Sequence, residues 1–319
     1  MEMVLALAEN VNAPALLAEA HGQMGVFQMA IGSFEAAREH MERALEVGLE
    51  VERALKIGVD VGPRTFRRAV LGLMSNVLVE LGYSEAAQKK SQEFLSASRQ
   101  LSDPDTLGPA LFFDAWIRIK LRDTAMVMER AQELLSTSNE TGSLFHRNHA
   151  KFFRGWALAA AGQGRNGITA MREAVSALVP VGGMRTLLFA TLAEACESNG
   201  LCQEGLSAVA AGLEHAEQTG ERHHQAELLK IKGDLIIMLD PADAGEAVRH
   251  FRSAIDIAGQ QAAKLSELRA TISLARLLKS QGQIEEARQM LSDIYGSFTE
   301  GLDTADLKDA KALLDELGS

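Results

Sequence analysis

The sequence predicts an all-α protein, a right-handed α-solenoid of about seven helix-turn-helix units with a C-terminal capping helix. The composition is the first indication, because Ala and Leu dominate while Val, Ile, Thr and Tyr rarely form the short alternating runs typical of strands. Hydrophobic residues make up 47% of the 319 residues, enough to bury a substantial core. The second indication is an internal repeat, in which a small residue recurs at a nearly constant spacing.

Each unit carries a turn residue, then a small or short apolar residue five positions later, then an apolar residue four positions further on. In the stretch "GSFEAAREHMERA" these are Gly32, Ala37 and Met41. The middle position is occupied in turn by Ala37, Ala87, Val127, Gly167, Gly205, Ala247 and Ala287. The spacing is close to 40 residues, with one stretched interval of 50 between the first two copies. We therefore expect seven units within a single superhelical domain, residues 1–319.

The elements of each unit follow from its small residues. Gly25, Gly155 and Gly233 should let the two helices of their units approach closely, and the glycine at the turn supplies the positive φ that ends helix A. The units are expected to end near residues 48, 98, 138, 178, 218, 260 and 298. A capping helix is expected over 303–317, begun by Asp303 or Thr304, with its apolar stripe formed by Leu307, Ala310, Leu314 and Leu317.

With its early small residue in helix A and its A-x3-F-x2-A type of run in helix B, the unit resembles the tetratricopeptide (TPR) repeat. Longer stretches, such as "FFRGWALAAAGQGRNGI" and the terminal "IYGSFTEGLDTADLKDAKALL", are similar to the C-terminal TPR region of bacterial signalling proteins. In that family a class III adenylate or guanylate cyclase domain, an AAA/STAND ATPase domain, or both, precede the repeats. The chain has no Walker A sequence and no recognisable cyclase carboxylates, so the resemblance implies a non-catalytic regulatory region.

The stretch "AAGQGRNG" contains the spacing G-x-G-x-x-G, from Gly162 to Gly167, that cradles a dinucleotide in βαβ folds. The preceding "FFRGWALAA" has the pattern of a helix, whereas the motif requires a strand there. We therefore interpret Gly162 as the end of helix A and Gly167 as the small packing residue of helix B, and we expect no nucleotide cofactor.

Charge and cysteine content exclude several other classes. A net charge of −11 repels polyanions, so we expect no nucleic-acid partner. The chain lacks a run of ~18 apolar residues and a basic N-terminal signal region, which favours a cytoplasmic protein without a membrane partner. Cys196 and Cys202 do not have C-x-x-C spacing, and we expect no metal site.

The function that we expect is the binding of a protein or peptide, or of neighbouring domains, on the concave face formed by the A helices. The alternative is a small-molecule sensor that controls an attached cyclase, ATPase or transcription activator, which would require an enclosed pocket. No nucleophile, base and orienting group form a recognisable catalytic set, so we expect no enzyme.

Alignment of the units predicts which side chains face the concave groove. These residues are Phe112, Trp116, Lys120, His149, Phe152, Trp156, Glu194, Glu197, Lys230, Asp234, Arg276 and Lys279. The F-F-x-x-W pattern at Phe112 recurs 40 residues later at Phe152, so the two aromatic sets should stack side by side. We expect Phe112, Trp116, Phe152 and Trp156 to be exposed as anchors for a ligand.

Overall fold

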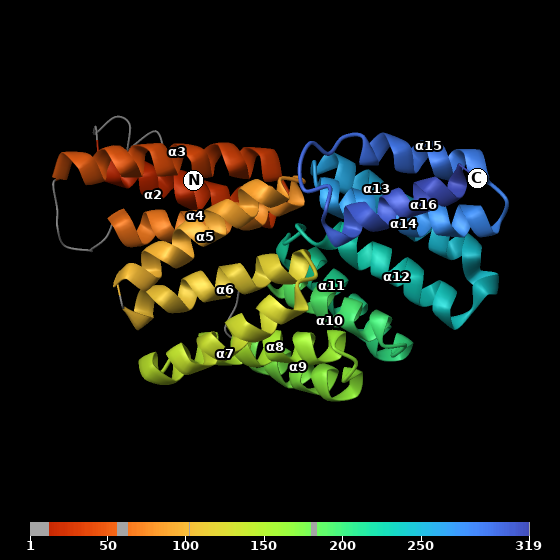
Figure 1. The fold of residues 1–319 in the computed structure, drawn as a ribbon, viewed down its shortest axis with the longest axis horizontal. Coiled ribbons are helices and arrows are strands. Elements are labelled where there is room, and N and C mark those ends of the chain that lie inside the picture. Colours follow the sequence, from red (N-terminus) through yellow and green to blue (C-terminus); the bar gives the residue numbers. More distant parts are fainter. Residues whose placement is uncertain (1–12, 56–62, 102, 180–183, 319) are drawn as a thin grey trace.

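The computed structural model describes residues 13–55, 63–101, 103–179 and 184–318, and within them every regular element is helical (Figure 1). The helices are α2 (Pro14–Ala30), α3 (Phe34–Leu55), α4 (Pro63–Glu80), α5 (Ser84–Leu101), α6 (Pro104–Lys120), α7 (Thr124–Thr141), α8 (Leu144–Ala160), α9 (Gly164–Leu178), α10 (Arg185–Ser198), α11 (Cys202–Thr219), α12 (Gln225–Leu239), η2 (Pro241–Asp243), α13 (Ala244–Gln260), α14 (Lys264–Ser280), α15 (Ile284–Tyr295) and α16 (Ala305–Leu317). Consecutive helices pair, from α2 with α3 to α14 with α15, and α16 follows the seventh pair. The prediction of an all-α solenoid is confirmed. None of the described helices combines the length and the hydropathy that a membrane span requires.

The turns within the units have the geometry that their glycines predict. In five of the seven units a glycine follows helix A with φ between 70° and 89°, at Gly32, Gly82, Gly162, Gly200 and Gly282. An L side chain is disfavoured in this left-handed region, and a glycine there ends the helix without strain. The sixth unit uses the 3-10 turn η2 instead, and in the third unit Arg122 takes the position at a φ of 59°.

Close helix contact within a unit depends on the small residues. A Cβ added to Gly155 would lie 2.7 Å from the carbonyl oxygen of Gly167, so α8 and α9 touch backbone to backbone. A Cβ on Gly25 would meet Met41, and one on Gly233 would meet Phe251. The predicted role of these glycines is confirmed. Because helix α8 precedes Gly162 to Gly167, this motif lacks the strand that dinucleotide binding requires.

The capping helix α16 covers the end of the solenoid with Leu307, Ala310, Leu313 and Leu317. Leu313 is buried and Leu314 is only partly buried, so the stripe is shifted by one residue from the predicted position. Thr304 occupies the N-cap position, but its side chain makes no capping hydrogen bond.

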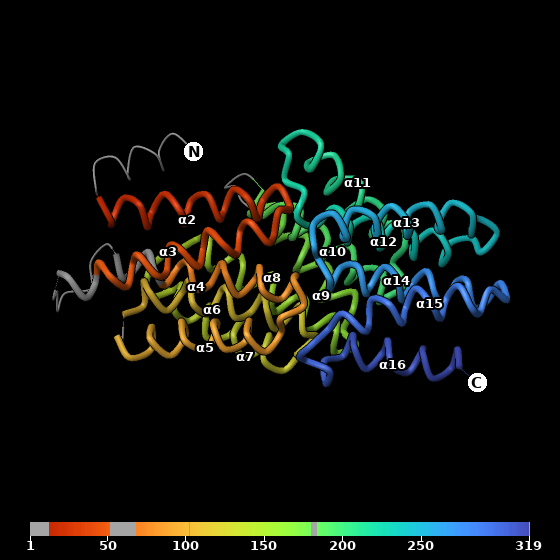
Figure 2. Tube along the Cα trace, turned by 90° about the horizontal axis from the view of Figure 1, so that it is seen from above, coloured from red at the N-terminus to blue at the C-terminus, as the bar shows by residue number. Residues whose placement is uncertain are grey.

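The two ends of the solenoid meet. Figure 1 shows α2 to α5 and α13 to α16 as two arms that approach each other above α6 to α11, and Figure 2 shows the same meeting from above. Backbone N–H of Arg222 donates to the carbonyl of Ala30 at 2.7 Å. The N–H groups of Glu85 and Ala86, at the start of α5, donate to Glu300 Oε1 at 2.8 and 3.1 Å. The turns of the first units therefore dock on the loops that join the last ones, and the superhelix is closed into a compact arch.

Candidate functional site: a cavity lined by the A helices

A cavity opens on the inner side of the arch, where the turn from α6 to α7 meets α8, α10, α12, α14 and α16. It has two adjoining halves that share Arg122, Glu194 and Ser198. The apolar half, of about 220 Å³, is lined in addition by Thr124, Trp156, Ala159, Ala160, Ala195 and Asn199. The charged half, of about 130 Å³, is lined in addition by Glu197, Lys230, Arg269, Ile272, Ser273, Arg276, Asp306 and Asp309. We call the two halves together the helix-A cavity.

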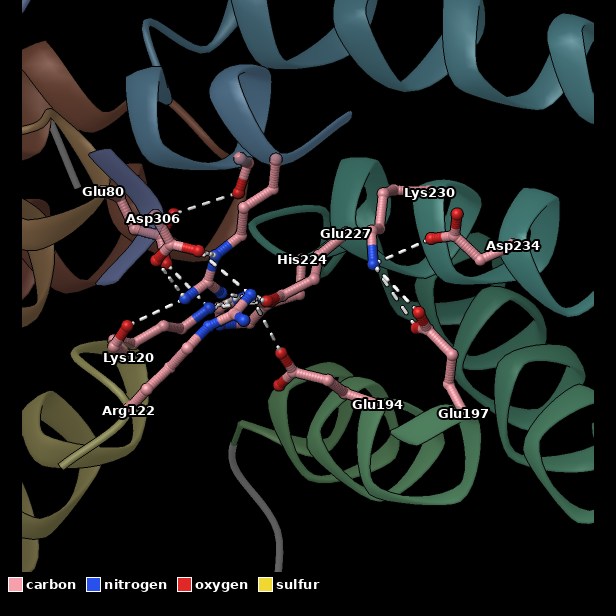
Figure 3. A network of polar contacts seen from close by, with 12 residues as sticks. Glu80, Lys120, Arg122, Glu194, Glu197, His224, Glu227, Lys230, Asp234 and Asp306 are labelled. Carbon is pink, nitrogen blue, oxygen red and sulfur yellow. Dashed lines mark hydrogen bonds and ion pairs between the residues drawn. The ribbon is translucent and has the colours of Figure 1, made fainter. Parts of the chain in front are cut away.

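In the charged half, Lys230 lies between two carboxylates. Its Nζ is 2.8 Å from Asp234 Oδ2 and 3.3 Å from Glu197 Oε1 (Figure 3). Ser273 also donates a hydrogen bond to Asp234. Burial raises the pKa of Glu197 to about 7, although Lys230 acts to lower it. Burial also lowers the pKa of Lys230, but the two carboxylates outweigh it and keep the ammonium group charged. Lys230 is therefore a fixed positive charge in the cavity wall, whereas the carboxyl of Glu197 titrates near pH 7.

Arg122 spans both halves of the helix-A cavity. Its side chain is nearly half exposed, and its Nη2 lies 2.9 Å from Asp306 Oδ1 and 3.9 Å from Glu194 Oε1. A non-glycine residue in the left-handed region costs about 1 kcal/mol, and such strain is concentrated at functional sites. Since the equivalent position is glycine in five other units, the Arg122 side chain distinguishes the third unit.

Behind the cavity, a buried ion network joins the two arms (Figure 3). Glu227 Oε2 accepts from Lys120 Nζ at 2.7 Å, and Glu227 Oε1 accepts from Arg269 Nη1 at 3.0 Å. Lys120 also lies 2.9 Å from Glu80 Oε1, and Arg269 Nη2 lies 2.9 Å from Asp306 Oδ2. We call these five residues the partition network, because Arg269 and Asp306 line the helix-A cavity while Lys120 and Glu80 face away from it.

Neighbouring cations stabilise the charges of Glu227 and Asp306 in the partition network against the penalty of burial. Burial by itself raises the pKa of Glu227, but Lys120, His224 and Arg269 bring it well below its usual value. Asp306 is likewise held below its ordinary pKa by Arg269 and Arg122, which outweigh its burial. Arg269 also donates to the carbonyl of Lys120 at 2.8 Å. The carboxylates of Glu227 and Asp306 are thus kept ionised, and the network ties α4, α6, α12, α14 and α16 together.

The structure brings together only some of the predicted groove residues. Trp156, Glu194, Glu197, Lys230 and Arg276 line the helix-A cavity, and Asp234 holds Lys230 from behind. Lys120 instead belongs to the buried partition network. Lys279, at the exposed end of α14, pairs with Glu316 at 2.6 Å.

The expected exposure of the aromatic residues is wrong. Phe112 and Phe152 are buried, Trp116 is 1% exposed, and Trp156 is 7% exposed with one edge in the cavity. The expected stacking does occur, since the Trp116 ring lies 5.6 Å from that of Phe152, centre to centre. The aromatic side chains that we assigned to the groove in the third and fourth units pack instead between their two A helices, α6 and α8, where their rings contact one another. His149 is also buried, 4.7 Å from the Phe112 ring.

The burial of His149 predicts that the free energy of unfolding depends on pH. Burial lowers its pKa from 6.5 to about 4, although the Phe145 carbonyl, which its Nδ1 contacts at 3.0 Å, acts to raise it. The folded state therefore favours the neutral imidazole, whereas the unfolded chain takes up a proton below about pH 6.5. The contribution of His149 to the free energy of unfolding is complete above pH 6.5 and is lost as the pH falls towards 4. We expect the stability advantage of the wild type over His149→Gln to shrink by about 2 kcal/mol between pH 7 and pH 5. Urea denaturation of both proteins measures this difference, and a difference that stays constant over the range would contradict it.

Several residues of the cavity were not predicted: Arg122, Ser198, Arg269, Ser273, Asp306 and Asp309. Arg269 and Ser273 lie on the same helix as Arg276, at helical spacing, which is a signal that a wider groove register would have included. Asp306 and Asp309 belong to the capping helix, which was treated only as a cover. Among the described residues, no group of three or more His, Cys, Asp and Glu side chains is arranged to hold a metal ion.

No protein-family model and no curated protein matches this sequence. Solved structures do share its fold. The crystal structure of a Rap protein complexed with competence and sporulation factor matches 94% of this chain and 80% of its own, with a TM-score of 0.64 and 14% identity. The apo form of RapI matches 94% of this chain and 99% of its own, with a TM-score of 0.57 and 12% identity. Yeast Tom70 is also similar, at a TM-score of 0.45. The likeness to the two Rap structures establishes a TPR-like solenoid.

Proposed function

We propose that this TPR-like chain is a non-catalytic binding module that takes up a peptide, or an extended segment of a protein partner, in the helix-A cavity. The observation that carries the proposal is the cavity itself, a hollow on the inner side of the arch with one apolar and one charged half. Solenoids of stacked helix pairs use their inner surfaces for recognition. Among the solved structures of this fold, the Rap protein was crystallised with a bound factor.

The two halves suit different parts of a peptide. An apolar side chain would lie against Trp156 and the alanines Ala159, Ala160 and Ala195. Polar backbone groups and charged side chains would face Glu194, Lys230 and Arg276. Because ion pairs already hold Lys230 and Arg276 in place, these side chains need little further ordering when a ligand binds.

The resemblance of the sequence to the repeat regions of bacterial signalling proteins supports a regulatory role for this module. Binding of a ligand in the helix-A cavity would change the activity of an effector, such as a cyclase or an ATPase domain. Arg122 and Asp306 offer the route, because each lines the cavity and also contacts the part of the fold where the two arms meet.

A small-molecule sensor is the second candidate, favoured by the size of the cavity. At about 220 and about 130 Å³, the two adjoining halves together reach the lower end of the ~300–1,000 Å³ that small-molecule sites occupy. The closed arch also limits the room for a long chain. The two candidates differ in the dependence of affinity on ligand length. A peptide whose affinity is unchanged when it is shortened to two residues would favour the sensor.

The test uses a library of random heptapeptides displayed on phage and selected against the wild-type protein. Ser198 lines both halves of the helix-A cavity, so Ser198→Trp should fill their junction and weaken a selected peptide at least tenfold in fluorescence anisotropy. Ser207→Trp is the matched control, because Ser207 is exposed on α11, outside the cavity lining. Equal affinities for the two variants, or failure to select any peptide, would contradict the proposal.

A further inference from the structure

A second, smaller chamber lies on the other side of the partition network. It has a volume of about 20 Å³ and shares no lining residue with the helix-A cavity. Its lining comes from the first arm, from α6, from the start of α10 and from the loop before α12: Met29, Phe34, Asn76, Glu80, Trp116, Lys120, Met184, Leu187, His223 and His224. We call it the inner chamber.

Trp116 brings an unused hydrogen-bond donor to the inner chamber. The side chain is 1% exposed, and its Nε1–H has no acceptor among the described protein groups. An indole nitrogen can only donate, and a buried indole usually finds a partner. Two charged residues that line the chamber, Lys120 and Glu80, are already engaged with each other, and Lys120 is also held by Glu227. The indole N–H of Trp116 therefore needs a hydrogen-bond acceptor other than the side chains of the partition network.

His223 brings a second unsatisfied group from the loop before α12. It is 4% exposed, and neither ring nitrogen forms a hydrogen bond of good geometry, although the Ala30 carbonyl is close by. Its Nδ1 is 3.9 Å from Glu221 Oε1, which is too long for a hydrogen bond. Burial, and then the neighbouring His224 and Lys120, lower the pKa of His223 well below 6.5. A neutral imidazole has one donor and one acceptor nitrogen.

We propose that the inner chamber is a binding site for a hydroxyl oxygen, supplied by an ordered water molecule, that accepts a hydrogen bond from Trp116 Nε1–H and bonds to His223. A hydroxyl is both acceptor and donor, so it satisfies the indole and either nitrogen of the imidazole. The volume selects water as its source, because a buried water needs roughly 10–15 Å³ and several polar partners. The water ties α6 to the loop before α12 and so extends the partition network.

Nuclear magnetic resonance of the full chain tests this site, because the protein has two tryptophans and hence two indole N–H resonances. The Trp116→Phe and Trp156→Phe variants assign them. We expect the Trp116 Hε1 proton to show cross peaks with water in both NOESY and ROESY spectra, of opposite sign, as a long-lived bound water produces. Cross peaks of equal sign, which arise from proton exchange, or no cross peaks, would overturn the proposal.

Replacing the second partner makes the test specific. His223→Leu keeps much of the side-chain volume but removes both nitrogens, and it should abolish the water cross peak of Trp116. His250→Leu is the matched control, since His250 is a half-buried residue of α13 that does not line the chamber, and its replacement should leave the cross peak intact. An unchanged cross peak in His223→Leu would remove His223 from the site.

A crystal structure of the wild type keeps the proposal testable if His223→Leu does not fold. Density for one oxygen within hydrogen-bond distance of Trp116 Nε1 and of a His223 nitrogen would support it. An empty chamber, or density for a molecule larger than water, would overturn the assignment.

Discussion

Arg269→Met is expected to lower the free energy of unfolding by about 3–5 kcal/mol, because it breaks two buried ion pairs and leaves Glu227 and Asp306 with one cationic partner fewer each. Arg269 is 7% exposed, and its guanidinium binds the carboxylates of Asp306 and Glu227 and the carbonyl of Lys120. Methionine fills part of the space but gives none of these hydrogen bonds. Among the described Lys and Arg side chains, Lys120 alone would then remain on Glu227 and Arg122 alone on Asp306, and both carboxylates are buried.

Urea denaturation at pH 7 measures the effect, and Arg276→Met is the matched control. Arg276 lies two turns further along α14 and pairs with Asp309, but its side chain is 55% exposed. An exposed pair contributes about 1 kcal/mol at most. If both variants lost the same small amount, the partition network would not hold the arms together.

Trp116→Ala should destabilise the protein by about 3–5 kcal/mol, the range found when a large buried side chain is truncated. The indole is 1% exposed and lies 5.0 Å from the Phe153 ring and 5.6 Å from the Phe152 ring, centre to centre. Removing it would open a cavity between α6 and α8. As a control, Phe27→Ala removes a side chain of α2 that is 51% exposed and should change the stability by about 0.5 kcal/mol or less.

Fluorescence gives an independent check on the burial of Trp116. In Trp156→Phe, Trp116 is the one remaining tryptophan, and acrylamide should barely quench its emission. Strong quenching together with a small loss of stability in Trp116→Ala would restore the original expectation of an exposed aromatic anchor.

The local features of the fold were predictable from the sequence. A glycine such as Gly282 ends a helix whatever surrounds it, and a pair such as Gly155 and Gly167 brings two neighbouring helices together. These signals depend on residues close in the chain, which the repeat displays again and again. The capping helix was also predictable, apart from the shift of one residue at Leu313.

The candidate site was predictable only in part, because it depends on how distant units meet. The pattern of its own unit predicts that Lys120 faces the groove. Closure of the arch instead places Glu227 and Glu80 against it. Similarly, Trp116 is buried by an aromatic set of the next unit, whose register against α6 no single unit reveals. The pattern within a repeat predicts which side of a helix faces inward, but it does not predict whether that side meets solvent or another helix.

The most direct test of the account is a crystal structure of the chain with a heptapeptide selected against it. We predict continuous peptide density in the helix-A cavity, with an apolar side chain against Trp156 and polar groups facing Glu194 and Lys230. Peptide density on the outer surface formed by the B helices, with the helix-A cavity holding only solvent, would contradict it.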